Sequence, residues 1–183
     1  MLPRDARRRG GAAGSRHPVQ PAWRFAALLL AAAVLVTAFA PCALADGEPR
    51  FAAGADPFVA NCAVCHRASG AGTPGLAPPV TGYPPRFIAT AEGRRQLVLT
   101  VLYGMFGEIV IDERHYNFKM PDFARLDDAT LAATLNYLAF DLGRASSDAA
   151  PLTAAEVAAE RTRAVDGSVV RQHRSEVVGA LPR

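Results

Sequence analysis

One short motif, Cys62-Ala63-Val64-Cys65-His66, constrains this chain more than any other feature of its sequence. The chain has 183 residues and 3 cysteines, and the third cysteine, Cys42, lies in an apolar N-terminal stretch. A chain of this composition would contain Cys-x-x-Cys-His by chance on the order of once in a thousand cases. This cysteine content is too low for a disulfide-rich scaffold, so the motif indicates a chemical site.

Three chemistries use cysteines at this spacing. A thioredoxin-like dithiol pair would need a preceding strand and a parallel sheet, but the sequence shows no alternation of strands and helices. A zinc site would need two further ligands, and the later histidines, His115 and His173, are distant and isolated. Covalent attachment of a c-type haem uses both thiols and the imidazole and needs no further cysteine. The motif therefore favours a haem-attachment site.

Helical geometry brings the three side chains of the motif together. Asp56-Pro57 is a typical helix start, with Asp as N-cap and Pro at the first helical position, so the sequence predicts one helix over residues 57–66. Cys62, Cys65 and His66 then lie at i, i+3 and i+4 on one face of that helix. From such a face, two thiols can add to the two vinyl groups of a haem while the imidazole lies over the iron.

The motif and the segments that follow it resemble a class I cytochrome c over roughly residues 53–143. The resemblance implies a mainly α fold, in which a small helical domain surrounds one covalent haem and a short β-hairpin precedes a methionine-bearing loop. It implies haem c, with its iron, as the single cofactor, in keeping with one attachment motif and no internal repeat. Because the redox chemistry of such a protein belongs to the haem, the chain is not expected to be an enzyme.

A glycine-rich loop, residues 70–82, follows the motif and contains Pro78, twelve residues after His66. The resemblance implies that the Pro78 carbonyl accepts a hydrogen bond from the second ring nitrogen of His66. Such a bond orients the imidazole and makes it a stronger donor to iron. The alternative is that Pro78-Pro79 only stiffens the loop.

The sixth iron ligand has to come from later in the chain, where the candidates are Met105, His115, Met120 and His173. Met120 is followed directly by Pro121 and resembles the family's axial-ligand loop, so His66 and Met120 are the predicted metal ligands. A His/Met pair raises the reduction potential of the iron. Met105 is interpreted as a flexible, gap-filling core residue and His115 as a polar residue on a strand.

Two elements lie between the glycine-rich loop and the Met120 loop. Apolar residues at one-face spacing predict a helix over residues 90–103, with Gly104 as its stop. Residues 108–116 alternate around an acidic turn and predict a small hairpin. We expect the Tyr116 hydroxyl to reach toward the haem or the methionine sulfur; the alternative is a half-buried strand tyrosine without a haem contact.

The last helix of the core is predicted over residues 128–140. Asp127 is its expected N-cap, leucines at i, i+4 and i+7 form its buried stripe, and Gly143 ends it. In the resembled fold this helix crosses the first one. Phe58 and Val59 are therefore expected to pack against it.

The N-terminus has the pattern of an export signal, which predicts a signal peptide over residues 1–45. Several arginines precede the uncharged apolar run of residues 25–39, and Ala43-Leu44-Ala45 before Asp46 is a typical cleavage site. We therefore expect the mature protein in the periplasm. The alternative is an uncleaved membrane anchor over residues 25–44, and only then would the protein contact a membrane.

The mature chain is expected to contain a cytochrome c domain, residues 46–143, and a partly helical C-terminal extension, residues 144–183. Residues 145–151 have the composition of a linker, and a capping-box pattern at Thr153 opens a short helix. Residues 168–183 alternate valines with charges. The extension is either a peripheral tail that wraps the core or a docking element for a dehydrogenase.

Charge is unevenly distributed along the chain. Residues 1–45 contain six arginines and one acid, so the remainder has 14 basic and 16 acidic side chains. A mildly acidic mature protein offers no surface for nucleic acid, and no nucleic-acid partner is expected.

These observations predict a periplasmic electron-transfer protein, either a soluble carrier or the cytochrome subunit of a dehydrogenase. Its expected partners are redox proteins: a periplasmic dehydrogenase as donor and a terminal oxidase or another acceptor. The alternative function is a haem enzyme or gas sensor with an open or labile sixth iron position. That alternative is favoured only if Met120 does not bind the iron.

Overall fold

The computed structural model describes residues 48–163 and 165–181, and these residues belong to one compact unit. The predicted signal peptide, its cleavage site and the alternative membrane anchor lie outside the described residues and stay predictions. Within the described ranges, no helix has the length and apolar character needed to cross a bilayer.

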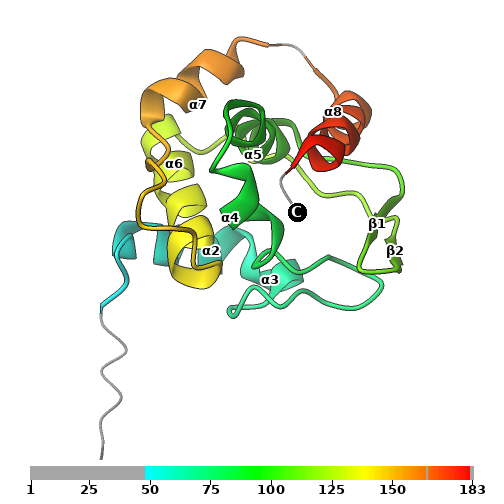
Figure 1. The fold of residues 1–183 in the computed structure, drawn as a ribbon, viewed down its shortest axis with the longest axis horizontal. Helices are drawn as coiled ribbons and strands as arrows, with labels where there is room; N and C mark the ends of the chain where they lie inside the picture. The colour runs from blue at the N-terminus through cyan, green and yellow to red at the C-terminus, as the bar shows by residue number, and fades with distance from the viewer. Residues whose placement is uncertain (1–47, 164, 182–183) are drawn as a thin grey trace, which may run out of the picture. The chain divides into compact units, whose positions relative to one another are not determined.

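Helices dominate the described part of the chain, as predicted, and a two-stranded antiparallel hairpin interrupts them (Figure 1). The first helical segments are η1 (Ala52–Gly54), α2 (Ala55–Asn61), α3 (Ala63–His66), α4 (Tyr83–Phe87) and α5 (Ala91–Tyr103). The hairpin strands β1 (Ile109–Ile111) and β2 (Arg114–Tyr116) follow. The later segments are α6 (Asp128–Asn136), η2 (Tyr137–Leu142), α7 (Ala154–Arg161) and α8 (Gly167–Ala180).

The predicted single helix over residues 57–66 is wrong at both its start and its middle. Helix α2 begins at Ala55 because η1 directly precedes it, so Asp56 already has helical neighbours and does not cap the helix. The helix is interrupted at Cys62, where φ is −114° and ψ is −36°, and resumes as α3. The amides of Cys65 and His66 both point to the Cys62 carbonyl, at 3.2 and 2.9 Å, so the motif keeps a helical turn.

The first helical segment crosses α6 at a very close approach. A Cβ atom added to Gly54 would lie 2.1 Å from the Ala133 carbonyl oxygen, so only glycine fits at the crossing. Phe58 is fully buried there, with its ring centroid 5.8 Å from that of Tyr137. The expected packing of Val59 is wrong: its side chain is 56% exposed, since one helical residue further turns it about 100° away from Phe58.

Helix α5 has the predicted limits. The Thr90 hydroxyl accepts a hydrogen bond from the Gly93 amide at 3.0 Å, and the helix ends at Gly104, whose φ is +69°. The hairpin also lies where it was predicted, with Asp112 and Glu113 in the turn at φ values of 49° and 63°. Two turn residues at positive φ allow β1 and β2 to pair directly.

Helix α6 confirms the predicted start but changes character before its predicted end. The Asp127 carboxylate caps it, accepting from the Thr130 amide at 2.7 Å. From Tyr137 the wider π-helical turns of η2 continue it to Gly143. The sequence pattern does not distinguish α from π turns, because both continue the same buried face.

The C-terminal extension packs on the core along its length. Helix α7 begins with the predicted Thr153–Glu156 capping box and lies beside α6, while α8 lies beside α5 (Figure 1). Apolar side chains of the extension enter the main hydrophobic core: Leu152, Val157, Val177 and Leu181.

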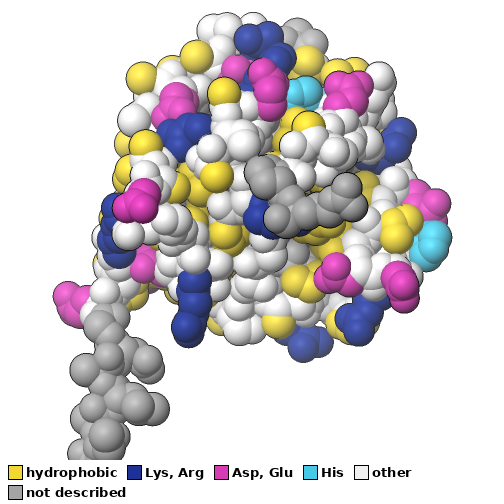
Figure 2. Space-filling model, in the orientation of Figure 1, with side chains coloured by type: hydrophobic (Ala, Val, Ile, Leu, Met, Phe, Trp, Pro, Cys, Tyr) yellow, Lys and Arg dark blue, Asp and Glu magenta, His cyan; other side chains and the backbone are white. Residues whose placement is uncertain are grey.

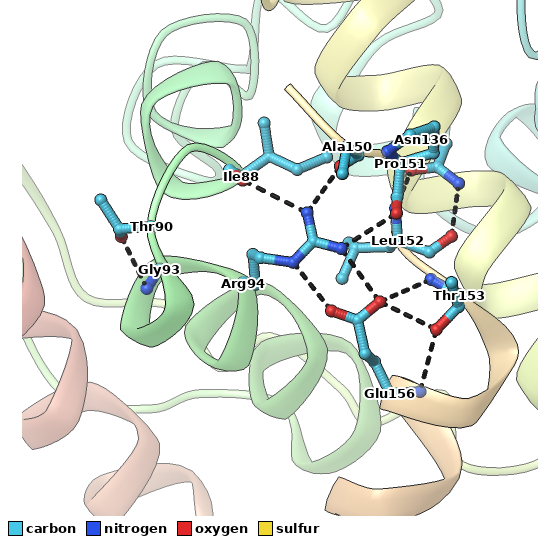
Figure 3. A network of polar contacts seen from close by, with 10 residues as sticks. All are labelled: Ile88, Thr90, Gly93, Arg94, Asn136, Ala150, Pro151, Leu152, Thr153 and Glu156. Carbon is cyan, nitrogen blue, oxygen red and sulfur yellow. Dashed lines mark hydrogen bonds and ion pairs between the residues drawn. The ribbon is translucent and has the colours of Figure 1, made fainter. Parts of the chain in front are cut away.

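Polar contacts also join the extension to the core, and Figure 3 shows how they converge on Arg94 of α5. The Arg94 guanidinium donates from Nε and Nη2 to both carboxylate oxygens of Glu156, at 2.8 and 2.9 Å. It also donates to the carbonyls of Ala150 and Pro151, at 2.6 and 2.9 Å. One largely buried arginine therefore holds both the linker and the start of α7.

The Gly54 crossing predicts that Gly54→Ala destabilises the protein by about 1–3 kcal/mol, because the added methyl group overpacks a backbone contact. Gly179→Ala is the matched control, since no atom lies within 4 Å of an added Cβ on this exposed turn of α8. Urea unfolding should show the loss only in the first variant. Equal stability of the two variants would contradict the packing argument.

The Arg94–Glu156 pair predicts a pH-dependent contribution to stability. Hydrogen bonds from Arg94 are the largest cause that lowers the pKa of Glu156 below its ordinary value of 4.5. Stability from this carboxylate is therefore fully present above about pH 4.5 and is lost as the pH falls through the lowered pKa of the folded state.

Glu156→Gln should cost about 0.5 kcal/mol at neutral pH, since water screens a partly exposed pair. The free energy of unfolding of the wild type should approach that of the variant at acidic pH. Glu176→Gln, at an exposed position of α8, is the control expected to show no such convergence. A constant difference between wild type and Glu156→Gln at every pH would contradict the linkage.

Candidate functional site

A largely apolar cavity lies between the motif, the loop after it, α4, α5, the hairpin and the loop that contains Met120. All six predicted site residues line this cavity: Cys62, Cys65, His66, Pro78, Tyr116 and Met120. They come from four segments that are far apart in the sequence. The described residues that line the cavity include no aspartate or glutamate.

The two cysteines of the motif are free and partly buried. Burial raises the pKa of the Cys62 thiol to about 11, although Arg125 partly opposes this effect. A thiol that stays protonated at neutral pH is a poor nucleophile for disulfide exchange. The pair is therefore poorly suited to dithiol redox chemistry, the first alternative raised by the sequence.

His66 is buried at the cavity wall and has the hydrogen bond that was predicted for it. Its Nδ1 atom lies 2.8 Å from the carbonyl oxygen of Pro78. A carbonyl only accepts, so Nδ1 carries the proton and Nε2 keeps a free lone pair. Burial lowers the pKa of His66 and the Pro78 bond raises it, so the ring is kept neutral, the state that binds a metal.

The loop after the motif folds back tightly on α3, and this brings Pro78 to His66. Gly72 has a φ of +75°, and a Cβ added there would lie 2.6 Å from the Ala77 carbonyl oxygen. The Thr73 hydroxyl donates to the Cys65 carbonyl at 2.9 Å. The Pro78–His66 bond is thus part of a braced loop, and Pro78 does more than stiffen it.

Met120 lies in a loop that is held against the end of α5. Its amide donates to the Met105 carbonyl at 2.8 Å, and the Met105 amide donates to the Met120 carbonyl at 3.1 Å. Gly104 makes room for this pairing, because a Cβ added there would lie 2.4 Å from the Met120 carbonyl oxygen. Met105 also lines the cavity, so its interpretation as a core gap-filler is incomplete.

Tyr116 is buried on β2, with only 4% of its surface exposed, and faces the cavity. The alternative of a half-buried strand tyrosine is wrong, because the hairpin closes one side of the cavity. His115, the preceding residue, is exposed and lies 2.9 Å from Glu108, as expected for a polar strand residue.

The structure also bears on the zinc alternative. His173 lies on α8, where its ring nitrogens contact Gln96 at 2.5 Å and Glu92 at 3.2 Å. Neither His115 nor His173 lines the cavity. Across the described ranges, no group of three or more His, Cys, Asp or Glu side chains could hold a metal ion together.

Two residues of the cavity wall were not predicted from the sequence. Tyr83 comes from α4, and Arg174 comes from α8 in the extension. No local pattern marks either of them, because α8 reaches the cavity only by packing along α5.

The donor set fits a covalently attached haem. Two thiols lie beside a neutral imidazole with a free Nε2, the walls are apolar, and thioether side chains lie on the loop next to α5. The fold and this site together define a haem-attachment domain.

Comparison with known proteins agrees with this assignment. The family model for cytochrome c matches residues 51–139. Cytochrome c-552 of Thermus thermophilus is 37% identical to this chain over 120 residues, which cover 64% of this chain and 92% of the relative. Cytochrome c-552 of a second Thermus thermophilus strain is also 37% identical over 120 residues, covering 81% of that relative.

The chain belongs to the cytochrome c family. It is a class I c-type cytochrome that binds covalent haem c with its iron and serves in haem-based electron transfer. The match to the family ends before α7 and α8 begin.

The motif predicts that Cys62→Ala/Cys65→Ala abolishes covalent attachment, because no other cysteine lines the cavity in the described part of the chain. Intact mass after denaturation should show haem on the wild type and none on the double variant. Val64→Ala changes the exposed middle of the motif and should keep the haem, as a matched control. Covalent haem on the double variant would exclude these thiols as the attachment points.

Proposed function

We propose that this protein is a periplasmic carrier of one electron, on a haem attached through Cys62 and Cys65, with His66 and Met120 as axial iron ligands. The observation that carries the proposal is that one cavity is lined by the motif, by a neutral His66 with a free Nε2, and by Met120. When bound, the haem supplies the Fe(II)/Fe(III) couple.

The residues around the cavity hold the ligands and exclude water. The Pro78 carbonyl fixes the plane of the His66 ring and increases its donor strength. The backbone pairing with Met105 limits the motion of Met120. Apolar walls and a thioether ligand both favour the reduced iron and so raise the potential. Tyr116 closes the side of the cavity formed by the hairpin.

In this proposal both axial positions are occupied by side chains, so no substrate reaches the iron and the protein is not an enzyme. The alternative, a haem enzyme or gas sensor, requires a sixth position that opens. The presence of two methionines along the cavity makes the identity of the sixth ligand the decisive question.

Electron exchange requires a surface that a redox partner can meet. Val64 and Phe118 line the cavity and are also 82% and 63% exposed. Figure 2 shows charged side chains of both signs scattered over the visible face, without a large patch of one sign. Lys119 is the only lysine in the chain. These features support a small, transient and mainly apolar contact with the partner.

Within this proposal the partners are a periplasmic dehydrogenase as donor and a terminal oxidase or another acceptor. The periplasmic location is supported by the signal pattern of residues 1–45. N-terminal sequencing of the exported protein should begin at Asp46, and an unprocessed N-terminus would support the membrane-anchored alternative.

A carbon monoxide titration tests the axial ligands. The reduced wild type should show a low-spin c-type spectrum that carbon monoxide does not change, because both axial positions are held. Met120→Ala should open the sixth position, so carbon monoxide should shift the spectrum fully. The potential of this variant should also fall, since the thioether favours Fe(II).

Met105→Ala is the matched control, as it removes the neighbouring methionine of the same cavity. This variant should keep the spectrum of the wild type. If Met105→Ala binds carbon monoxide and Met120→Ala does not, the sixth ligand is Met105. A wild type that itself binds carbon monoxide would move the enzyme or sensor function to the front.

A further inference from the structure

Helix α8 places a positive charge in the wall of the cavity. Arg174 lines the cavity and is only 8% exposed. Lys119, the other strongly basic side chain of the wall, is exposed. Arg174 is thus the one buried cation among the described residues that line the site.

The Arg174 guanidinium is oriented but lacks a counter-charge. Its central carbon lies 4.9 Å from the centre of the Tyr83 ring, so the guanidinium contacts the face of that ring. Its Nη2 atom is buried without a hydrogen-bond partner among the described residues. By contrast, Arg94 and Arg161 each contact a carboxylate, at 2.8 and 2.7 Å.

A buried and unpaired arginine is unfavourable, because the guanidinium stays charged and loses its hydration. Burial lowers the pKa of Arg174, and its contact with Tyr83 raises it, which shows the cost of this position. The described part of the cavity wall offers no carboxylate to balance the charge. The site therefore requires an anion from the molecule that it binds.

The haem of this family provides such an anion. Its two vinyl groups react with cysteines, and its two propionate carboxylates lie on the opposite edge of the ring. In Figure 1, α3 with the motif and α8 lie on separate sides of the molecule, and both contribute to the cavity wall. A haem anchored by its vinyl groups at α3 therefore directs its carboxylates away from α3.

We propose that Arg174 of the C-terminal extension binds a haem propionate. The planar guanidinium, held on the face of Tyr83, presents a fork of donors that matches a carboxylate. The match to the cytochrome c family ends at residue 139, so the extension adds a residue to the cofactor site from outside the matched region. This inference rests on the proposed attachment of the haem at Cys62 and Cys65.

The reduction potential of the holoprotein tests this proposal. Arg174→Met removes the charge and keeps a long side chain, and it leaves a propionate charge without compensation. The uncompensated negative charge favours Fe(III), so the potential should fall. The equilibrium constant for reduction should decrease about tenfold, or 59 mV for one electron.

Two further variants show whether the effect comes from the specific pair. Arg174→Lys keeps the charge and should recover most of the potential. Arg171→Met removes a charge from the same helix, at a position that does not line the cavity, and should change the potential little. An arginine with only a packing role would lower the thermal stability of Arg174→Met without a shift of potential.

The proposal is overturned if Arg174→Met shifts the potential no more than Arg171→Met, or if Arg174→Lys behaves like Arg174→Met. If Arg174→Met does not fold, a crystal structure of the wild-type holoprotein decides. A guanidinium nitrogen within hydrogen-bond distance of a propionate oxygen supports the proposal, and a propionate bound elsewhere excludes it. Failure here leaves covalent haem and the carbon monoxide result intact, whereas failure of the proposed function removes or changes those signals themselves.

Discussion

The hydrophobic core of this protein is built around a cavity, so the same side chains stabilise the fold and enclose the cofactor. Phe87 of α4, Leu97 of α5 and Leu135 of α6 belong to the main core cluster, and all three also line the cavity. The apolar surface that faces the cavity is buried fully only when the haem is bound, which couples folding to cofactor attachment. The close crossing at Gly54 has the same double role, because it fixes α2 against α6 and so holds the motif at the cavity wall.

The two sides of the cavity are supported in different ways. On the His66 side, hydrogen bonds from the following loop determine which ring nitrogen carries the proton. On the Met120 side, a short backbone pairing with Met105 positions a loop that has no helix of its own. Both arrangements depend on a glycine where the backbones approach closely, Gly72 on one side and Gly104 on the other. Ligand geometry is therefore set by backbone packing.

The C-terminal extension is part of the same core. Arg94 binds its first helix through Glu156, and the Asn136 side chain exchanges two hydrogen bonds with the backbone of Leu152, at 2.9 and 2.7 Å. These contacts hold α7 against α6, and α8 then lies along α5 with Arg174 at the cavity. A peripheral tail describes the path of the extension but misses its contribution to the cavity wall. Its other predicted role, docking to a dehydrogenase, stays a prediction.

The sequence by itself determined the features that depend on neighbouring residues. The attachment motif, the caps at Thr90, Asp127 and Thr153, and the hairpin turn are short patterns whose energies are local. The resemblance to cytochrome c, which rests on the motif and the two loops, also led to all six predicted residues that line the cavity. The predicted hydrogen bond between His66 and Pro78 is present for the same reason.

Only the tertiary structure decided which further side chains reach the cavity and where helices change course. The break at Cys62, the outward position of Val59 and the π turns of η2 depend on how segments pack against one another. Arg174 follows His66 by more than a hundred residues, and it reaches the cavity because α8 packs on α5. Contacts across such separations arise from shape and buried area in three dimensions, which no short sequence pattern encodes.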